Sequence, residues 1–378
     1  MALTAAAHGY NFCSGPSALP AAVMQRAQAE FTDYRHCGSS IIEMSHRSEA
    51  FLAVLAAAAA RLRDLLAVPG DYRILFMHGG ASLQFSALAL NLLAPGGKAG
   101  YLDTGYWSQK AYLEAQQFGR VELIGSAARY DYKRGLAATD YQIDGDLAYV
   151  HYTPNETIDG LAFDHIPETG PVPLVADMSS CILSEPIDVR RFGLIYAGAQ
   201  KNIGPAGLAV VIVRADLLGQ AQVQTPRLLN YGIVAAERSL ANTPPTFAIY
   251  LANLVFRWLG EQGGLGVVAE RNRTKAAMLY KALDASQLFY NDVAPAHRST
   301  MNVPFFLRDA ASRGVSLQDN AALAAAFSAA ADRAGLLNLT GHRSRGGFRA
   351  SLYNAMPTAG VQALVEFLHL FENDYDRY

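Results

Sequence analysis

Short apolar runs that alternate with helix-patterned stretches constrain the fold of this chain more than any other feature. The runs are rich in Val, Ile, Leu and aromatic residues, as buried strands are, and they lie at 74–77, 100–102, 147–151, 172–176 and 208–213. Strands that alternate with helices predict an open α/β sheet. Because ligands bind beyond the carboxyl ends of the strands in such sheets, we expect the functional residues at those ends.

Lys201 lies in a loop rich in Gly and Pro, between a short apolar run and the strand expected at 208–213. The glycines of this loop permit tight turns and the close approach of another group. A lysine held at the rim of a buried sheet loses hydration, which lowers its pKa and frees the amine as a nucleophile. Covalent attachment of a carbonyl cofactor requires such an amine, although a solvated surface lysine is the alternative interpretation.

Asp177 ends the apolar run at 172–176, 24 positions before Lys201. A carboxylate at the end of a buried strand needs a cationic or hydrogen-bonding partner. The pyridinium nitrogen of a lysine-bound pyridoxal phosphate would serve, since the ring must stay protonated to accept electrons. Capping of the next segment by Asp177 is the alternative.

A glycine pair follows the run at 74–77, in the segment His78-Gly-Gly-Ala-Ser-Leu-Gln84 that leads into a helix. A strand, two glycines, small residues and a helix start present N–H groups and a positive helix end to an anion. The segment lacks both the GK[ST] ending of a Walker loop and the GxGxxG pattern of dinucleotide binders. It therefore predicts either a phosphate cup of another kind or a simple tight turn.

Three further segments are candidates for the site. Trp107 follows the run at 100–102 and either stacks on a planar ring or packs in the core. Arg47 is either an anion clamp or part of the polar approach to a helix that Ser48 caps. The cationic segment 341–349 either borders a cleft or is solvated surface.

Length and composition set the outer limits. At 378 residues the chain favours two domains, and we place the boundary in the glycine-dense segment 260–266. This gives a large domain at 1–260, with an N-terminal arm, and a small α+β domain at 261–378. A net charge of −2 without a basic run argues against nucleic acid or a membrane as partner. The sequence has three scattered cysteines and no metal-binding motif, so we expect a protein without a metal. It has no apolar run of membrane length and no signal peptide within residues 1–9, so we expect it to be cytoplasmic.

The chain resembles the phosphoserine aminotransferases, which are class-V, fold type I pyridoxal-phosphate enzymes. The resemblance runs from about Asn11 to Phe371 and is carried by NFCSGPSALP, EMSHRS, HGGASLQF, HYTPNETIDG, VADMSS, YAGAQKNIGPAGL, NTPPTFAIY, HRSTMNVPF and GHRSRGGFRASLYNAMP. It implies a large domain with a mixed, mostly parallel sheet, a smaller α+β domain, and a homodimer with shared active sites. It also implies ping-pong transfer of the amino group of L-glutamate to 3-phosphohydroxypyruvate, giving O-phospho-L-serine and 2-oxoglutarate in serine biosynthesis. Some members of the family also serve pyridoxine biosynthesis.

The resemblance also assigns residues to the cofactor, pyridoxal 5'-phosphate. Lys201 would hold it covalently and carry the proton, Asp177 would pair with the pyridinium, and Trp107 would stack on the ring. Thr157 would bond near its phenolic oxygen. The phosphate would be bound by Ala81, Ser82 and Gln200 together with Asn242 and Thr243 of the partner subunit.

On the substrate side, Arg349 would take the α-carboxylate, with Ser14 beside it. The substrate phosphate, or the side-chain carboxylate of glutamate, would be held by His342 and Arg343 of the same subunit and by Arg47 of the partner subunit. Two departures stand out: Ala81-Ser82-Leu83 lacks an arginine that some relatives carry in this turn, and Cys13 replaces a frequent serine.

Other functions also remain open from the sequence. A cysteine desulfurase or a small-substrate aminotransferase would share this fold, although a desulfurase needs a reactive cysteine on a mobile loop. A catalytically silent ligand-binding protein would not need Lys201, Asp177 and the arginines together. A nicotinamide oxidoreductase would need the missing glycine fingerprint.

Overall fold

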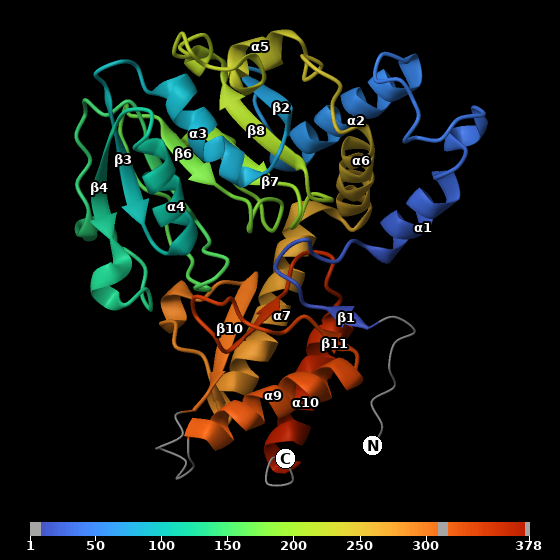
Figure 1. Cartoon of the computed structure of the whole chain (residues 1–378), viewed down its shortest axis with the longest axis vertical. Coiled ribbons are helices and arrows are strands. Elements are labelled where there is room, and N and C mark those ends of the chain that lie inside the picture. Colours follow the sequence, from blue (N-terminus) through green and yellow to red (C-terminus); the bar gives the residue numbers. More distant parts are fainter. Residues whose placement is uncertain (1–8, 309–316, 375–378) are drawn as a thin grey trace.

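A seven-stranded sheet organises the larger part of the chain in the computed structural model, which describes residues 9–308 and 317–374 (Figure 1). The strand order is β2-β8-β7-β6-β5-β3-β4, and β8 runs in the direction opposite to the other six strands. This confirms the predicted mixed, mostly parallel sheet. The strands are β2 (Tyr72–His78), β3 (Lys98–Asp103), β4 (Arg120–Ser126), β5 (Val150–Tyr152), β6 (Leu174–Asp177), β7 (Leu194–Gly198) and β8 (Leu208–Arg214).

Helices cover both faces of this sheet. One core contains α3 (Ala81–Leu92), α4 (Tyr106–Ala115) and α5 (Tyr231–Ala236). The other contains α1 (Ala21–Glu30), α2 (Glu49–Leu66) and α6 (Thr246–Glu261). Strand β7 shows why the runs are apolar throughout: Leu194 and Tyr196 enter the first core, whereas Ile195 and Ala197 enter the second.

A smaller α+β unit follows, in the lower part of Figure 1. Its antiparallel sheet has the order β12-β10-β9, and it packs with phenylalanines of α9 and α10 into a separate core. Its elements are α7 (Gly264–Ala285), β9 (Phe289–Tyr290), β10 (Asn302–Leu307), α9 (Leu317–Arg333), β11 (Leu336–Leu337), β12 (Phe348–Ser351) and α10 (Thr358–Asp374). The domain boundary near residue 260 stays a prediction.

The N-terminal arm lies against this smaller unit. Strand β1 (Tyr10–Asn11) pairs in parallel with β11, and Phe12 is fully buried in the core of the smaller unit. The arm then crosses to the large sheet, where Ser17 N donates to the Gln200 carbonyl. Residues 1–8, on which the expectation about a signal peptide rests, lie outside the described residues.

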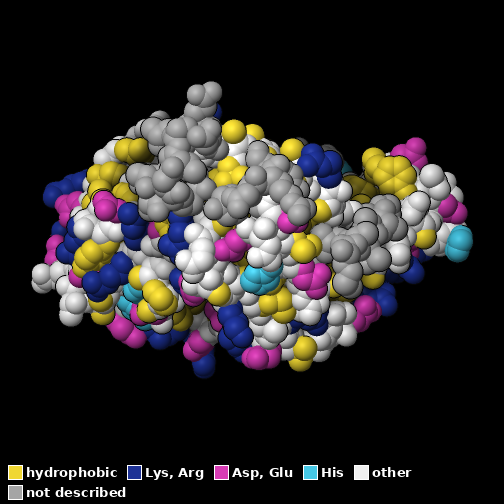
Figure 2. Space-filling view, turned by 90° about the horizontal axis from the view of Figure 1, so that it is seen from below, with side chains coloured by type: hydrophobic (Ala, Val, Ile, Leu, Met, Phe, Trp, Pro, Cys, Tyr) yellow, Lys and Arg dark blue, Asp and Glu magenta, His cyan; other side chains and the backbone are white. Residues whose placement is uncertain are grey.

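One face of the molecule agrees with the weak net charge of the chain. On the face in Figure 2, Lys and Arg side chains are interspersed with Asp and Glu and form no single basic patch. Among the helices of the described residues, none has the length and apolarity needed to cross a bilayer.

Candidate active site

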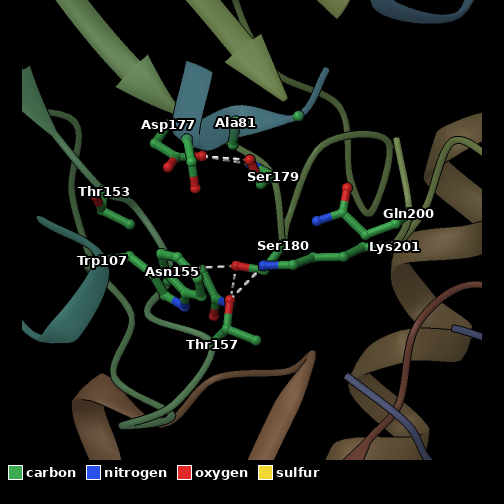
Figure 3. A pocket seen from close by; sticks show the side chains of 12 residues that line it. Ala81, Trp107, Thr153, Asn155, Thr157, Asp177, Ser179, Ser180, Gln200 and Lys201 are labelled. Atoms are coloured by element: carbon green, nitrogen blue, oxygen red, sulfur yellow. Dashed lines mark hydrogen bonds between the residues drawn. The ribbon is translucent and has the colours of Figure 1, made fainter. Parts of the chain in front are cut away.

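A pocket lies where five strands of the large sheet end, and Figure 3 shows the side chains that line it. The segments after β2, β3, β5, β6 and β7 each contribute to its wall, as the strand-end argument predicts. Its volume is about 480 Å³, including the part that opens to solvent. Its lining residues are Gly80, Ala81, Ser82, Trp107, Thr153, Asn155, Thr157, Asp177, Ser179, Ser180, Gln200 and Lys201.

Lys201 is buried in this pocket. Its Nζ donates to Thr157 Oγ1 at 2.5 Å and lies 5.8 Å from the centroid of the Trp107 ring. Burial lowers the pKa of Lys201 to about 8, and the negative charge of Asp177 only partly opposes this effect. A sizeable fraction of the amine is therefore neutral at mildly alkaline pH, as a nucleophile or a base requires.

Asp177 ends β6 on the opposite wall of the pocket. Its Oδ1 accepts hydrogen bonds from Ser179 N at 2.9 Å and from Ser179 Oγ at 2.5 Å. Burial raises the pKa of Asp177 above its ordinary value, while the Ser179 hydrogen bonds and the charge of Lys201 pull it down. A buried carboxylate held in this way favours a cationic or N–H partner inside the pocket.

The start of α3 forms an anion-binding corner. Gly80 caps the helix without a side-chain hydrogen bond, so the first N–H groups, from Ala81 onward, face the pocket. Gly198 keeps the corner open, because a Cβ there would lie 2.6 Å from Gln200 Oε1 and 3.2 Å from Ala81 N. The corner has the shape and the donors that a phosphate group needs.

Two polar atoms in the wall lack partners. Within the described part of the chain, Thr153 Oγ1 and Trp107 Nε1 are buried without a hydrogen bond. Buried polar groups are normally paired, so unpaired ones lining a pocket indicate a bound polar group. Together with the anion corner, the amine and the opposed carboxylate, this wall fits a phosphorylated, protonated pyridine aldehyde.

Glu156, which the sequence analysis did not single out, fixes the position of Trp107. Its carboxylate accepts from Trp107 N at 3.0 Å and from Ser108 N at 2.9 Å, at the N-terminus of α4. Burial first, and then the charge of Asp159, raise the pKa of Glu156 to about 8. The two oxygens of this side chain close the helix start and orient the indole against the pocket.

Arg349, on β12 of the smaller unit, reaches the rim of the pocket. Its Nη2 donates to Ser14 Oγ at 2.5 Å and its Nη1 to the Thr157 carbonyl at 3.3 Å. Burial lowers the pKa of Arg349. The predicted pair of Ser14 and Arg349 thus lies beside Thr157, which also binds the amine of Lys201.

His342 and Arg343 belong to the turn that precedes β12. The His342 ring lies 5.2 Å from the ring of Tyr106, next to Trp107, whereas Arg343 is exposed. Burial lowers the pKa of His342, and the positive charges of Arg349 and Arg343 lower it further. Positive groups of the smaller unit therefore gather at the mouth of the pocket.

Three predicted residues are neither in the pocket wall nor among the groups described at its mouth. Arg47, Asn242 and Thr243 are exposed in the structure. The Thr243 carbonyl accepts a hydrogen bond from His78 Nε2 at 2.7 Å, which ties this loop to the edge strand β2. Their assignment to the partner subunit stays a prediction.

Four lining residues had no predicted role: Thr153, Asn155, Ser179 and Ser180. Asn155 Nδ2 donates to Ser180 Oγ at 2.7 Å and to Asn302 Oδ1 at 3.0 Å, so it links the pocket to the smaller unit. The sequence could have indicated all four, since each follows a buried strand within a few residues.

Comparison with known proteins agrees with this geometry. The profile of the family described as aminotransferase class-V matches residues 9–364. The phosphoserine aminotransferase of Pseudomonas paraeruginosa is 54% identical over 365 residues, which cover 97% of this chain and 98% of that protein. The solved phosphoserine aminotransferase of Bacillus circulans subsp. alkalophilus has a TM-score of 0.93 and 44% identity, covering 98% of this chain and 100% of that one. The solved pyridoxal-phosphate-bound phosphoserine aminotransferase of Trichomonas vaginalis has a TM-score of 0.88 and 40% identity, covering 96% and 100%.

Proposed function

The chain belongs to the class-V aminotransferase family, and on this premise we propose that it carries out the reaction of its phosphoserine aminotransferase relatives. It is a pyridoxal-phosphate enzyme that moves the amino group of L-glutamate to 3-phosphohydroxypyruvate. The products are O-phospho-L-serine and 2-oxoglutarate, and the reaction belongs to serine biosynthesis. The observation that carries this assignment is the buried Lys201 amine, which faces Asp177 across a pocket with an anion-binding corner.

The residues of the pocket suit the cofactor group by group. The first N–H groups of α3, from Ala81 and Ser82, would bind its phosphate together with Gln200, and Trp107 would lie against its ring. Asp177 would keep the ring nitrogen protonated, and Thr157 would bond near the phenolic oxygen. When bound, pyridoxal phosphate supplies the carbonyl group and the electron-accepting ring that amino transfer needs.

Lys201 would move the proton. Its lowered pKa keeps part of the amine neutral, so Nζ would take the proton from the substrate Cα and hold it during the transfer. Thr157 Oγ1 accepts from Nζ and restricts where the amine points. Such positioned proton transfer contributes about 10²- to 10⁴-fold in rate.

The cationic groups at the mouth of the pocket would select the substrate. Arg349 would take the α-carboxylate in a bidentate pair, with Ser14 at its Nη2. His342 and Arg343 would bind the distal phosphate of the keto acid or the γ-carboxylate of glutamate. Each substrate has an α-carboxylate and a second anionic group, and each of these two groups would meet its own cationic side chains. Both substrates can therefore use one pocket.

We also propose a cytoplasmic homodimer with shared sites. Support comes from Arg47, Asn242 and Thr243, which carry anion-binding groups and are exposed in a single chain. All three cysteines, which lie in the described residues, are free thiols, as a reducing compartment favours. Burial raises the pKa of Cys181, which argues against Cys181 as the reactive thiolate of a desulfurase.

A coupled assay tests the function. Wild-type protein should form O-phospho-L-serine from L-glutamate and 3-phosphohydroxypyruvate, with much slower turnover of unphosphorylated hydroxypyruvate. Lys201→Ala should keep its melting temperature within a few degrees and lose turnover by at least about a hundredfold. Wild-type turnover by Lys201→Ala would refute the assignment.

A further inference from the structure

Arg345 lies in the same cationic turn as His342 and Arg343, but its side chain is already engaged. Its Nη1 donates to Asp159 Oδ1 at 2.8 Å and to the Asp159 carbonyl at 3.2 Å, and its Nη2 donates to Asp292 Oδ1 at 2.6 Å. The guanidinium lies 5.4 Å from the centroid of the Phe306 ring. Only 14% of the Arg345 side chain is exposed, so this arginine is not presented to a ligand as Arg343 is.

The backbone of Arg345 is bonded to His342. Arg345 N and Gly346 N both donate to the His342 carbonyl, at 2.9 and 2.8 Å, and Gly341 N donates to the Gly347 carbonyl at 2.9 Å. The turn is therefore a tightly bonded unit. A displacement of Arg345 would carry His342 and Arg343 with it.

Asp159, at the other end of the ion pair, belongs to the loop after β5 that also contains Thr157. Its Oδ2 accepts from Tyr106 N at 3.2 Å, and the Tyr106 ring contacts His342. Two residues earlier, Thr157 binds both the Lys201 amine and Arg349. Arg345 therefore contacts both ends of one chain of contacts: it binds Asp159 directly, Asp159 binds Tyr106, Tyr106 contacts His342, and His342 is bonded to the backbone of Arg345.

We propose that Arg345 is a positioning residue for substrate selection. It bridges Asp159 and Asp292 and thereby holds the turn of His342 and Arg343 at the mouth of the pocket, at a fixed distance from Arg349. This inference rests on the proposed function. It adds a residue that binds no substrate itself but decides how well the distal phosphate is bound.

Charge compensation is the competing explanation. Asp159 interacts electrostatically with both His342 and Arg349. Without Arg345, an unpaired Asp159 would repel an anionic substrate, even if the turn did not move. Replacing Asp159 in the same protein separates the two explanations.

The experiment compares two amino substrates in the reverse half-reaction. Pyridoxal-phosphate-loaded wild type and Arg345→Met are mixed with O-phospho-L-serine or with L-serine, and the visible absorbance of the cofactor is followed. For Arg345→Met we expect kcat/KM for O-phospho-L-serine to fall about ten- to a hundredfold, because small displacements of binding groups have effects of this size. The loss should lie mainly in KM, and L-serine should change less than about twofold, because it has no phosphate for the turn to bind.

Arg298→Met is the matched control. Arg298 also lies in the smaller unit, with 13% of its side chain exposed, a bidentate pair to Asp284 at 2.7 Å and a Tyr280 ring at 4.7 Å. Its loss should cost a similar amount of stability and leave the preference for O-phospho-L-serine unchanged. Arg345→Lys is the second variant: it keeps the charge and the fold but cannot bridge both carboxylates as a planar fork, so it should show a smaller loss of the same preference.

Several outcomes would overturn the proposal. Equal losses for the two substrates, no loss in Arg345→Met and Arg345→Lys, or the same selective loss in Arg298→Met would each do so. Recovery of O-phospho-L-serine binding in the double variant Arg345→Met/Asp159→Asn would show that Arg345 acts by compensating the charge of Asp159 and not by positioning the turn. Failure of the wild type to use O-phospho-L-serine would instead refute the proposed function, so the two failures are distinguishable.

Discussion

Replacement of Lys201 by Met is expected to stabilise the cofactor-free protein near neutral pH. Burial lowers the pKa of Lys201 from the ordinary 10.5 to about 8, so the folded protein binds this proton more weakly than the unfolded chain does. At about 1.4 kcal/mol for each tenfold change in proton affinity, the protonated amine costs the folded state about 3 kcal/mol. Met is uncharged and removes this cost, but it also loses the hydrogen bond to Thr157, which contributes about 1 kcal/mol. The net gain at pH 7 is about 2 kcal/mol.

The pH dependence distinguishes this mechanism from better packing. Because the folded-state pKa is depressed, the cost of Lys201 is fully present below about pH 8 and disappears as the pH rises to the unfolded value of 10.5. The advantage of Lys201→Met should therefore fall by about 3 kcal/mol between pH 7 and pH 10.5 and change sign on the way.

Urea unfolding of both cofactor-free proteins at several pH values, at constant ionic strength, measures this difference. Lys110→Met, which removes an exposed lysine from α4, is the control and should show no such trend. A stability difference between wild type and Lys201→Met that is the same at pH 7 and pH 10 would refute the reasoning.

Three further predictions concern the loop at 156–159 and the proposed sharing of sites between subunits. Glu156→Gln leaves one acceptor oxygen for two helix N–H groups, so pyridoxal phosphate should bind about tenfold more weakly in equilibrium dialysis; unchanged affinity would contradict the role given to Glu156. Gly105→Ala places a Cβ 2.5 Å from Asp159 Oδ2 and should cost about 1–3 kcal/mol in thermal unfolding, whereas Gly145→Ala, with open space around it, should not. Mixed dimers of Lys201→Ala and Arg47→Ala subunits should regain activity, since one hybrid site contains both wild-type residues; silent mixed dimers would count against shared sites.

Much of the fold could be predicted because its strands are buried on both faces. Runs such as 208–213 have no polar positions, and this property alone separates them from amphipathic helices. Strand β4 was not predicted, because it lies at the sheet edge and none of its residues is fully buried. The short strands β1 and β9 depend on distant partners and carry no local pattern.

The candidate site was partly predictable for a related reason. Lys201, Asp177 and Trp107 each lie at or shortly after the end of a strand, and strand ends meet at one edge of a parallel sheet. Arg343 and Arg345, by contrast, are the same residue type in the same turn. Arg345 is bound to Asp159, which lies 186 positions away, and to Asp292, whereas Arg343 is exposed. Such pairings between residues far apart in the sequence leave no local pattern from which they could be predicted.

The pairing of β1 with β11 fixes how far along the N-terminal arm each residue lies from the pocket. Its register, Tyr10 opposite Leu336 and Asn11 opposite Leu337, is followed three residues later by the contact of Ser14 with Arg349. One inserted residue between Asn11 and Ser14 would advance the chain by about 3.3 Å and turn the serine to the opposite side. Insertions and deletions in the arm should therefore be as rare in evolution as substitutions in the pocket, although the arm lies more than 180 residues from Lys201 in sequence.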